Sequence, residues 1–217
     1  MKKLLFATLI AVSFAAQAQN IEVGIGAAQY TDRGDGVWYQ DAFQHKLKLT
    51  VPVAEIAVTG DISESLGYRA GWAWIGQANT QGMAVGDSNY NLQSKSCNGA
   101  CWPLANFVGG GHDQGFFVTA ERKLIFGDVR PSIEFGPYIH KSIWTENVYN
   151  WIPNATAVPQ NLTINNIQKW QIGALTGASV KMDNLTIRYQ YFFNKNTGDL
   201  HPAIWSGAHV ITANYEF

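Results

Sequence analysis

The chain has 217 residues, of which 47% are hydrophobic, and 15 Lys and Arg stand against 16 Asp and Glu. This nearly balanced charge argues against nucleic acid as a partner, and the hydrophobic content argues against a disordered chain. Glycine (21 residues) and aromatic residues (13%) are plentiful while charged residues make up only 14%, a mixture that suits an all-β protein.

The first 18 residues have the pattern of a signal peptide. Lys2 and Lys3 give a positive start, and the apolar run 4–16 is shorter than the roughly 20 residues that a transmembrane helix needs. "AQA" at 16–18 has small residues at the spacing that a signal peptidase cuts. We expect cleavage after Ala18, with an uncleaved N-terminal anchor as the alternative. Cleavage leaves 199 of the 217 residues, with 13 Lys and Arg against 16 Asp and Glu, and exports the protein.

Eight later segments alternate between apolar and other residues with a period of two, which is typical of β-strands. In chain order they are "IEVGIGAAQY" (21–30), "VAEIAVTGDI" (53–62), "YRAGWAWIG" (68–76), "GFFVTAERKL" (115–124), "VRPSIEFGPYIH" (129–140), "KWQIGALTGASVK" (169–181), "LTIRYQYFFN" (185–194) and "GAHVITANYEF" (207–217). No pattern indicates helices or internal repeats. No later stretch is long and apolar enough for a transmembrane helix.

The connections between these segments alternate in length. Short ones fall at about 63–67, 126–128 and 182–184, and long loops at about 31–50, 78–113, 147–166 and 195–206. Strict alternation predicts an antiparallel up-and-down sheet with its long loops at one end. Residues 19–217 then form one domain.

The two faces of the predicted strands differ in chemistry. One face carries aliphatic and aromatic residues. The other carries glycines and twelve charged residues, namely Glu22, Glu55, Asp61, Arg69, Glu121, Lys123, Arg130, Glu134, Lys169, Lys181, Arg188 and Glu216. Eight strands enclose little room, so glycines and paired charges fit the interior better than large rings. We therefore predict an eight-stranded antiparallel up-and-down transmembrane β-barrel, with apolar residues toward lipid and charges inside.

Alternatives to this arrangement remain at the sequence level. A soluble, lipocalin-like barrel would turn the apolar faces inward instead. In the membrane arrangement, the inward charges either pair across the lumen as a plug or line a narrow pore. Pro131 and Pro137 fall in one predicted strand and cannot donate ladder hydrogen bonds. We expect a bulge or a different register there.

The chain ends with "YEF" at 215–217, on an alternating strand. Together with the leader, the eight strands and the alternating connections, this ending resembles the small outer-membrane β-barrels of Gram-negative bacteria. The resemblance implies the bacterial outer membrane, termini in the periplasm, and contact with outer-membrane lipid and lipopolysaccharide. It also implies that the barrel assembly machinery reads the terminal aromatic, a role that falls on Phe217 with support from Tyr215. No cofactor is implied.

The two cysteines, Cys97 and Cys101, lie close together in the loop 78–113. In an oxidising compartment such a local pair indicates a disulfide, which would shape this loop. A metal site would need further ligands, and only His112 is near in sequence, so we expect no metal.

Candidate catalytic residues are few. His140 and Ser142, with Glu146 to complete the set, resemble the arrangement in outer-membrane lipid A deacylases, in which histidine activates a serine nucleophile. The alternation turns His140 and Ser142 inward, however, whereas a lipid-cleaving site must face the membrane, and the flanking residues do not match the fuller motif. The pairs His112–Asp113 and Asp199–His201 would suit an outer-membrane protease, although such pairs are more often solvated loop residues.

The long loops mix aromatic residues with Asn, Gly and Pro, as in "WPLANFVGGGH" (102–112) and "VYNWIPNATAVPQN" (148–161). Exposed aromatic residues on a rigid base suit a binding surface. The expected function is therefore a structural or surface-binding role, with extracellular loops as the contact surface for a ligand that the sequence does not name. A narrow, porin-like small-solute pore is the second hypothesis and a lipid-modifying enzyme the third.

Overall fold

The computed structural model describes residues 19–32, 43–85, 90–91, 96–97, 103–124, 129–151, 160–194 and 205–217, and the predicted signal peptide lies outside them. The strands are β1 (Gln19–Asp32), β2 (Phe43–Lys48), β3 (Thr50–Ser63), β4 (Leu66–Val85), β5 (Tyr90–Asn91), β6 (Ser96–Cys97), β7 (Pro103–Lys123), β8 (Arg130–Trp151), β9 (Gln160–Met182), β10 (Leu185–Phe193) and β11 (Trp205–Glu216). Within these ranges the chain forms no helix of the length and apolarity needed to cross a membrane.

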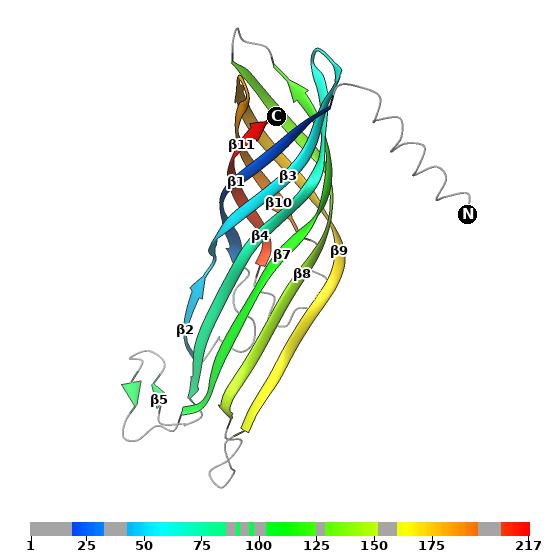
Figure 1. The fold of residues 1–217 in the computed structure, drawn as a ribbon. Helices are drawn as coiled ribbons and strands as arrows, with labels where there is room; N and C mark the ends of the chain where they lie inside the picture. Colours follow the sequence, from blue (N-terminus) through cyan, green and yellow to red (C-terminus); the bar gives the residue numbers. More distant parts are fainter. Residues whose placement is uncertain are drawn as a thin grey trace, which may run out of the picture.

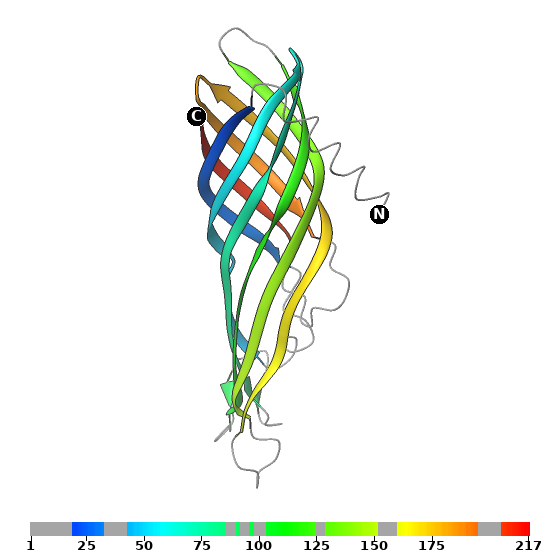
Figure 2. The same ribbon diagram turned by 45° about the vertical axis from the view of Figure 1, so that its right-hand side comes forward.

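Eight of these strands close into a barrel. The order β4-β3-β1-β11-β10-β9-β8-β7 is completed by pairing of β4 with β7, and every pairing is antiparallel. β2 pairs with β4 beyond the end of β3, from which only Leu49 separates it. Figures 1 and 2 show the tilted strands wrapped around one axis, with the C-terminus beside β1. The predicted eight-stranded, antiparallel, all-β architecture is confirmed.

The last strand closes the barrel. β11 pairs with β1 from Glu216 opposite Glu22 to Trp205 opposite Asp32, and the Phe217 amide donates to the Ile21 carbonyl at 2.9 Å. The alternating C-terminal sequence is therefore a strand whose edge is covered by the first strand of the domain.

The ladder has a fixed stagger. Starting at Gln29 on β1, the paired residues around the barrel are His209, Tyr191, Thr176, Phe135, Ala120, Tyr68 and Gly60, and the path returns to β1 at Gln19. One circuit thus moves from residue 29 to residue 19 of the same strand. A stagger of this kind forces closed strands to tilt against the barrel axis.

The polarity of the barrel is inverted relative to a soluble protein. Ile25, Phe135 and Ile172 on the outer face are 69%, 65% and 69% exposed, whereas Glu22 and Arg69 inside are 1% and 0% exposed. Exposed large aliphatic and aromatic side chains occur on seven of the eight strands of the barrel wall, and on β4 the outward Trp72 and Trp74 are half-buried. The lipocalin-like alternative, which requires the opposite arrangement, is therefore wrong.

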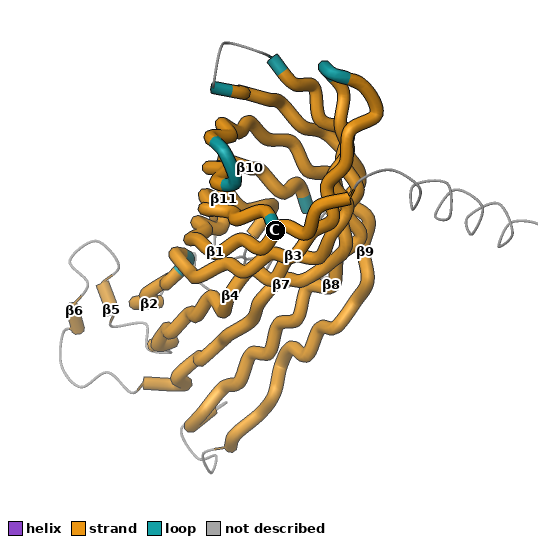
Figure 3. The backbone as a smooth tube through the Cα atoms, turned by 45° about the horizontal axis from the view of Figure 1, so that its top comes forward, coloured by secondary structure: helices purple, strands orange, loops and turns teal. Residues whose placement is uncertain are grey.

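Four strands are longer than predicted. β4 continues to Val85 and β7 begins at Pro103, while β8 continues to Trp151 and β9 begins at Gln160. The predicted loops 78–113 and 147–166 are therefore partly strand, and β2 occupies part of the predicted loop 31–50. Figures 1 and 3 show these strands running past the closed barrel as a sheet. Most of the loop 195–206 lies outside the described residues.

The two prolines of β8 leave the register unchanged. Pro131 lies opposite Val180 and Pro137 opposite Ala174 on β9, with no shift at either position. On the other side, β7 and β8 keep one register across Pro137, where two pairs are missing from the ladder. The expectation of a bulge or a changed register at these prolines was wrong, because the closed barrel tolerates the loss of single bonds there.

Candidate functional site

Two buried arginines organise an ionic layer across the lumen. Arg69 on β4 donates from Nε to Glu22 Oε1 and from Nη2 to Glu55 Oε2, both at 2.7 Å. Arg188 on β10 contacts Glu22 Oε2 and Glu121 Oε1, both at 3.1 Å, and Glu134 Oε1 at 3.5 Å. Glu22 thus links the two guanidinium groups. These strands come from all around the barrel, so the layer ties opposite walls together.

Neutral groups complete this layer. Glu134 accepts from Thr119 Oγ1 and from Gln190 Nε2, both at 2.9 Å, and Glu121 accepts from Ser132 Oγ at 2.6 Å. The Phe117 ring lies over the Arg69 guanidinium, 4.5 Å from it. Charges, hydroxyl groups and a ring therefore fill the lumen at this level, as a plug does.

The twelve predicted interior charges divide into three groups. Six form the buried layer, namely Glu22, Glu55, Arg69, Glu121, Glu134 and Arg188. Five lie at the barrel end that holds the short turns, where they line a cavity, namely Asp61, Lys123, Arg130, Lys181 and Glu216. The last, Lys169, is exposed on β9 beyond the buried interior, because β10 ends before reaching that height.

A second polar cluster surrounds the buried carboxylate of Asp113 on β7. Its Oδ2 accepts from Ser142 Oγ at 3.1 Å and from Asn194 Nδ2 at 2.8 Å, and its Oδ1 accepts from Tyr138 Oη at 3.2 Å. His140 Nδ1 lies 3.0 and 2.9 Å from the two carboxylate oxygens. The cluster is therefore a hydrogen-bonded part of the interior.

The candidate catalytic residues do not assemble a serine relay. Such a relay needs the serine on one histidine nitrogen and the carboxylate on the other. Here Ser142 Oγ lies 3.5 Å from Nδ1 of His140, the nitrogen that already contacts Asp113. His140, Ser142 and Glu146 are 0%, 1% and 0% exposed and face the lumen, away from lipid.

The other candidate sites also remain unassembled. His112 faces outward, with its ring 6.4 Å from that of Trp74, so it does not join Asp113 inside the barrel. Asp199, His201 and Cys101 lie outside the described residues, as does the side chain of Cys97, so the disulfide stays a prediction. Within the described part of the chain, no three His, Cys, Asp or Glu residues could together hold a metal ion.

Aromatic side chains fill the lumen on the side of the Asp113 cluster that lies away from the ionic layer. Tyr30 stacks on Trp205 with ring centroids 4.5 Å apart, and Trp144 meets Trp205 edge-on at 5.5 Å. Glycines on β7 make the room, since a Cβ atom on Gly109 would lie 2.4 Å from Trp144. Sequence analysis missed this layer by assuming that large rings face lipid. The glycines at 109 and 111, facing β8, were the available signal.

Tyr30 also marks a change in β4. Its hydroxyl lies 3.0 and 3.1 Å from the carbonyls of Ile75 and Gly76, and the register of β4 on β7 shifts between Ile75 and Ala78. Before this bulge the outward residues of β4 include Trp74, and after it they include Gln77. The bulge therefore separates two parts of β4 with different outer faces.

The outer face changes chemistry along one row of the ladder. Trp74 lies opposite Gln114, Gln114 opposite Lys141, and Lys141 opposite Trp170. On the barrel side of this row the exposed residues are apolar, as at Phe116, Ile139 and Ile172 on β7, β8 and β9.

Beyond the row the exposed residues are mainly polar. They include Gln77, Asn79 and Gln81 on β4, Asn106 and Val108 on β7, Tyr149 and Asn150 on β8, and Gln160, Asn161, Leu162, Thr163, Gln168 and Lys169 on β9. We call this part of β2, β4, β7, β8 and β9 the protruding sheet. Tryptophan next to polar side chains is typical of the border between hydrocarbon and water.

Comparison with known proteins gives little beyond this geometry. No family model and no curated protein matches the chain. Among solved structures, it is similar to the crystal structure of Ail, the attachment invasion locus protein of Yersinia pestis, in complex with the heparin analogue sucrose octasulfate. The TM-score is 0.45 at 12% identity, over 92% of this chain and 97% of that one. For Yersinia pestis Ail in a phospholipid bilayer nanodisc the TM-score is 0.33 at 12% identity, over 92% and 100% of the chains.

Register and burial identify the architecture without these neighbours. The chain is a closed eight-stranded barrel of the outer-membrane type. Only closed barrels and helices satisfy all backbone hydrogen bonds in hydrocarbon, and the wall of this barrel carries the apolar surface that hydrocarbon requires.

Proposed function

We propose that this protein resides in the bacterial outer membrane and uses the protruding sheet to bind a partner outside the cell. Strand length carries the proposal. A transmembrane strand needs about 9–11 residues. β10 and β11 have 9 and 12 residues, whereas β4, β7, β8 and β9 have 20, 21, 22 and 23. About half of each long strand therefore lies beyond the membrane, where a structural barrel alone would not need it.

The orientation follows from the ends of the barrel. Outer-membrane barrels have short periplasmic turns and longer extracellular connections. The tight turns 64–65 and 183–184 lie at the same end as the C-terminus, opposite the protruding sheet. Asp183 adopts φ 53°, as such a turn requires. We assign this end to the periplasm, where the assembly machinery would meet Tyr215 and Phe217.

The surface of the protruding sheet suits recognition. Val108 and Tyr149 on its outer face are each 40% exposed. Thr163 Oγ1 donates to Asn147 Oδ1 at 2.8 Å on the same face, so β8 and β9 are held together there. Tyrosine on a rigid support offers contact area at low entropic cost. The apolar outer wall of the closed barrel would contact outer-membrane lipid and lipopolysaccharide.

The other hypotheses receive no support from the geometry. A small-solute pore would have to pass the ionic layer of Arg69 and Arg188 and then the rings of Trp144 and Trp205, all of which are buried in the lumen. A lipid-modifying enzyme would need His140 and Ser142 on the lipid side. We therefore propose neither activity.

Cysteine labelling of intact cells tests the orientation. In a chain whose Cys97 and Cys101 are both replaced by Ser, we expect Asn79→Cys and Tyr149→Cys to react with a membrane-impermeant maleimide. Ser63→Cys, at the opposite end, should react only after the outer membrane is opened, and Ile133→Cys should stay protected by lipid. Labelling of Ser63→Cys but not of Asn79→Cys in intact cells would reverse the orientation and remove the binding proposal.

Binding itself can be tested on an array of extracellular-matrix proteins and glycans. Cells that display the native chain should adhere to at least one component more than cells without it. Tyr149→Ala should reduce this adhesion, while the lipid-facing control Val118→Ala should not. Equal adhesion by cells with and without the native chain across the array would overturn the proposed role.

A further inference from the structure

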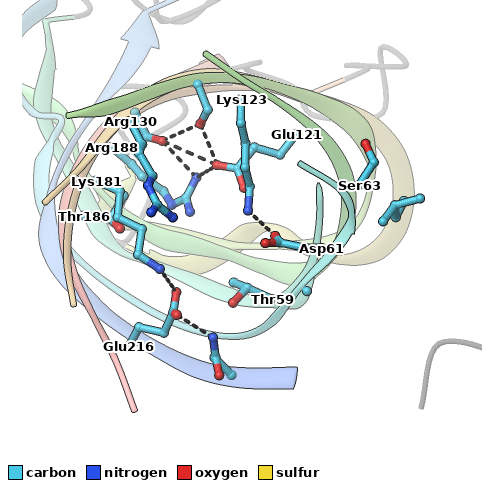
Figure 4. A pocket seen from close by; sticks show the side chains of 15 residues that line it. Thr59, Asp61, Ser63, Glu121, Lys123, Arg130, Lys181, Thr186, Arg188 and Glu216 are labelled. Atoms are coloured by element: carbon cyan, nitrogen blue, oxygen red, sulfur yellow. Dashed lines mark hydrogen bonds and ion pairs between the residues drawn. The ribbon is translucent and has the colours of Figure 1, made fainter. Parts of the chain in front are cut away.

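A polar cavity of about 390 Å³ opens at the periplasmic end of the barrel, away from the protruding sheet. Its volume lies within the roughly 300–1,000 Å³ of small-molecule sites. Arg188 and Glu121 of the ionic layer line it, together with hydroxyl groups that include those of Thr59 and Thr186. Figure 4 shows these side chains pointing into the cavity from several strands.

Three cations line one wall of this cavity, on β7, β8 and β9. They are Lys123, Arg130 and Lys181. Arg130 lies directly opposite Lys181 in the β8–β9 ladder. Like charges in directly opposite positions destabilise a sheet unless something neutralises them. The wall is therefore suited to an anion.

The carboxylates at the rim neutralise two of these cations. Lys181 Nζ contacts Glu216 Oε2 at 2.6 Å, and Lys123 forms an ion pair with Asp61. Gly67 permits the second pair, because a Cβ atom there would lie 2.9 Å from Lys123 Cε. Arg130 forms no ion pair with any residue that the structure describes, and its side chain is exposed. It is the cation left for a ligand.

The neighbouring acids also limit which anion fits. Asp61 and Glu216 remain close to the cavity and would repel a ligand with many negative charges. Hydroxyl groups such as those of Thr59, Ser63 and Thr186 suit a ligand that itself carries hydroxyl groups. The lining therefore favours one anionic group on a small, hydroxyl-rich molecule.

We propose that this cavity binds a small, hydroxyl-bearing anion, with its phosphate or carboxylate group held by Arg130. A guanidinium binds either group through two parallel hydrogen bonds, which makes Arg130 the main determinant. A sugar phosphate of the periplasm has this chemistry, and so does the glycerol phosphate head group of a phospholipid at the rim.

Titration of the refolded protein in phosphate-free maltoside micelles tests the proposal, with amide chemical shifts as the readout. Glucose 6-phosphate should bind saturably and more tightly than inorganic phosphate, and glucose should not bind. Arg130→Gln should weaken glucose 6-phosphate about tenfold, the worth of one charge-assisted contact. The control is Arg122→Gln, since Arg122 is an exposed arginine at the same end, bonded to Ser65 and absent from the cavity lining.

The outcomes are distinct. Saturable binding that Arg130→Gln weakens and Arg122→Gln leaves unchanged supports the site. No saturable binding of either phosphate, or equal weakening by both variants, overturns it. Soluble dihexanoyl phosphatidylglycerol serves as the second arm, and tighter binding of this lipid than of glucose 6-phosphate assigns the site to a head group. Because Arg130 is exposed, the variant should fold like the native chain, which its gel mobility before and after heating will show.

Discussion

The long strands β4, β7, β8 and β9 keep one secondary structure along their length, yet their outer faces differ in two regions. In the barrel wall the outward residues are apolar, as at Ile133 and Phe135, which are 58% and 65% exposed. In the protruding sheet they are mainly polar, as at Asn79 and Asn147. Antiparallel pairing of β4 with β7, of β7 with β8 and of β8 with β9 continues through both regions. This difference is the one expected if lipid surrounds the barrel wall and water surrounds the protruding sheet.

The interior shows a matching division. Inside the barrel wall, the lumen is filled by ion pairs around Arg69 and Arg188, whereas near the protruding sheet it is filled by Trp144 and Trp205. Opposite walls are thus tied by electrostatics at one level and by ring packing at the other.

The largest effect is expected from breaking the ionic layer. Arg188→Met removes the partner of Glu22, Glu121 and Glu134 and leaves buried carboxylates without compensation. Removing one member of a buried ion pair typically costs about 3–5 kcal/mol. Urea unfolding in lipid vesicles should show a loss of this size. A change below about 1 kcal/mol would mean that the layer does not hold the walls together.

A charge on the outer face should distinguish the two regions directly. Val118→Arg, midway along the apolar part of β7, places a cation against lipid, which costs about 2–4 kcal/mol near the bilayer midplane. Val108→Arg makes the same kind of change on the protruding sheet, where the face meets water and the effect should be within about 0.5 kcal/mol. Similar losses for both variants in the same unfolding assay would contradict the division.

A smaller effect is expected at the junction of the two regions. Tyr30→Phe removes the hydroxyl that accepts from the Asp113 amide at 3.0 Å and contacts the carbonyls of the bulge in β4. Leaving a buried polar group unsatisfied costs about 1–3 kcal/mol. Amide hydrogen exchange should also accelerate around residues 75–78. Unchanged exchange there would show that Tyr30 does not hold the bulge.

The smallest effect on stability is expected on the protruding sheet. Tyr149→Ala removes a side chain that is 40% exposed and should change unfolding by no more than about 0.5 kcal/mol. The same variant is expected to reduce adhesion. A large loss of stability would mean that Tyr149 supports the fold, and its effect on binding could not then be attributed to contact with a partner.

The sequence predicted the barrel wall well for a physical reason. Where one face meets lipid and the other a polar lumen, apolar and polar residues must alternate, as they do in Leu185–Phe193. The protruding parts of β4 and β8 lack this signal, because polar residues such as Asn79 and Asn147 lie on the outer face there. Their strands were therefore predicted as loops.

The lumen was harder to predict for a different reason. Alternation placed Glu22, Glu121 and Arg188 on the inner face, but their pairing depends on the register of strands far apart in sequence. Trp144 fits inside only because Gly109 and Gly111 stand on a neighbouring strand. The cluster around Asp113 likewise joins β7, β8 and Asn194, which no local pattern brings together.

Spin labels placed along the outer face of β8 test the central claim most directly, with collision rates for oxygen and for a water-soluble nickel complex as the readout. At positions 133, 135 and 139 we expect high oxygen and low nickel access in lipid vesicles, and at 147 and 149 the reverse. High nickel access at all five positions would show that the wall faces water, and the assignment to a membrane would be lost.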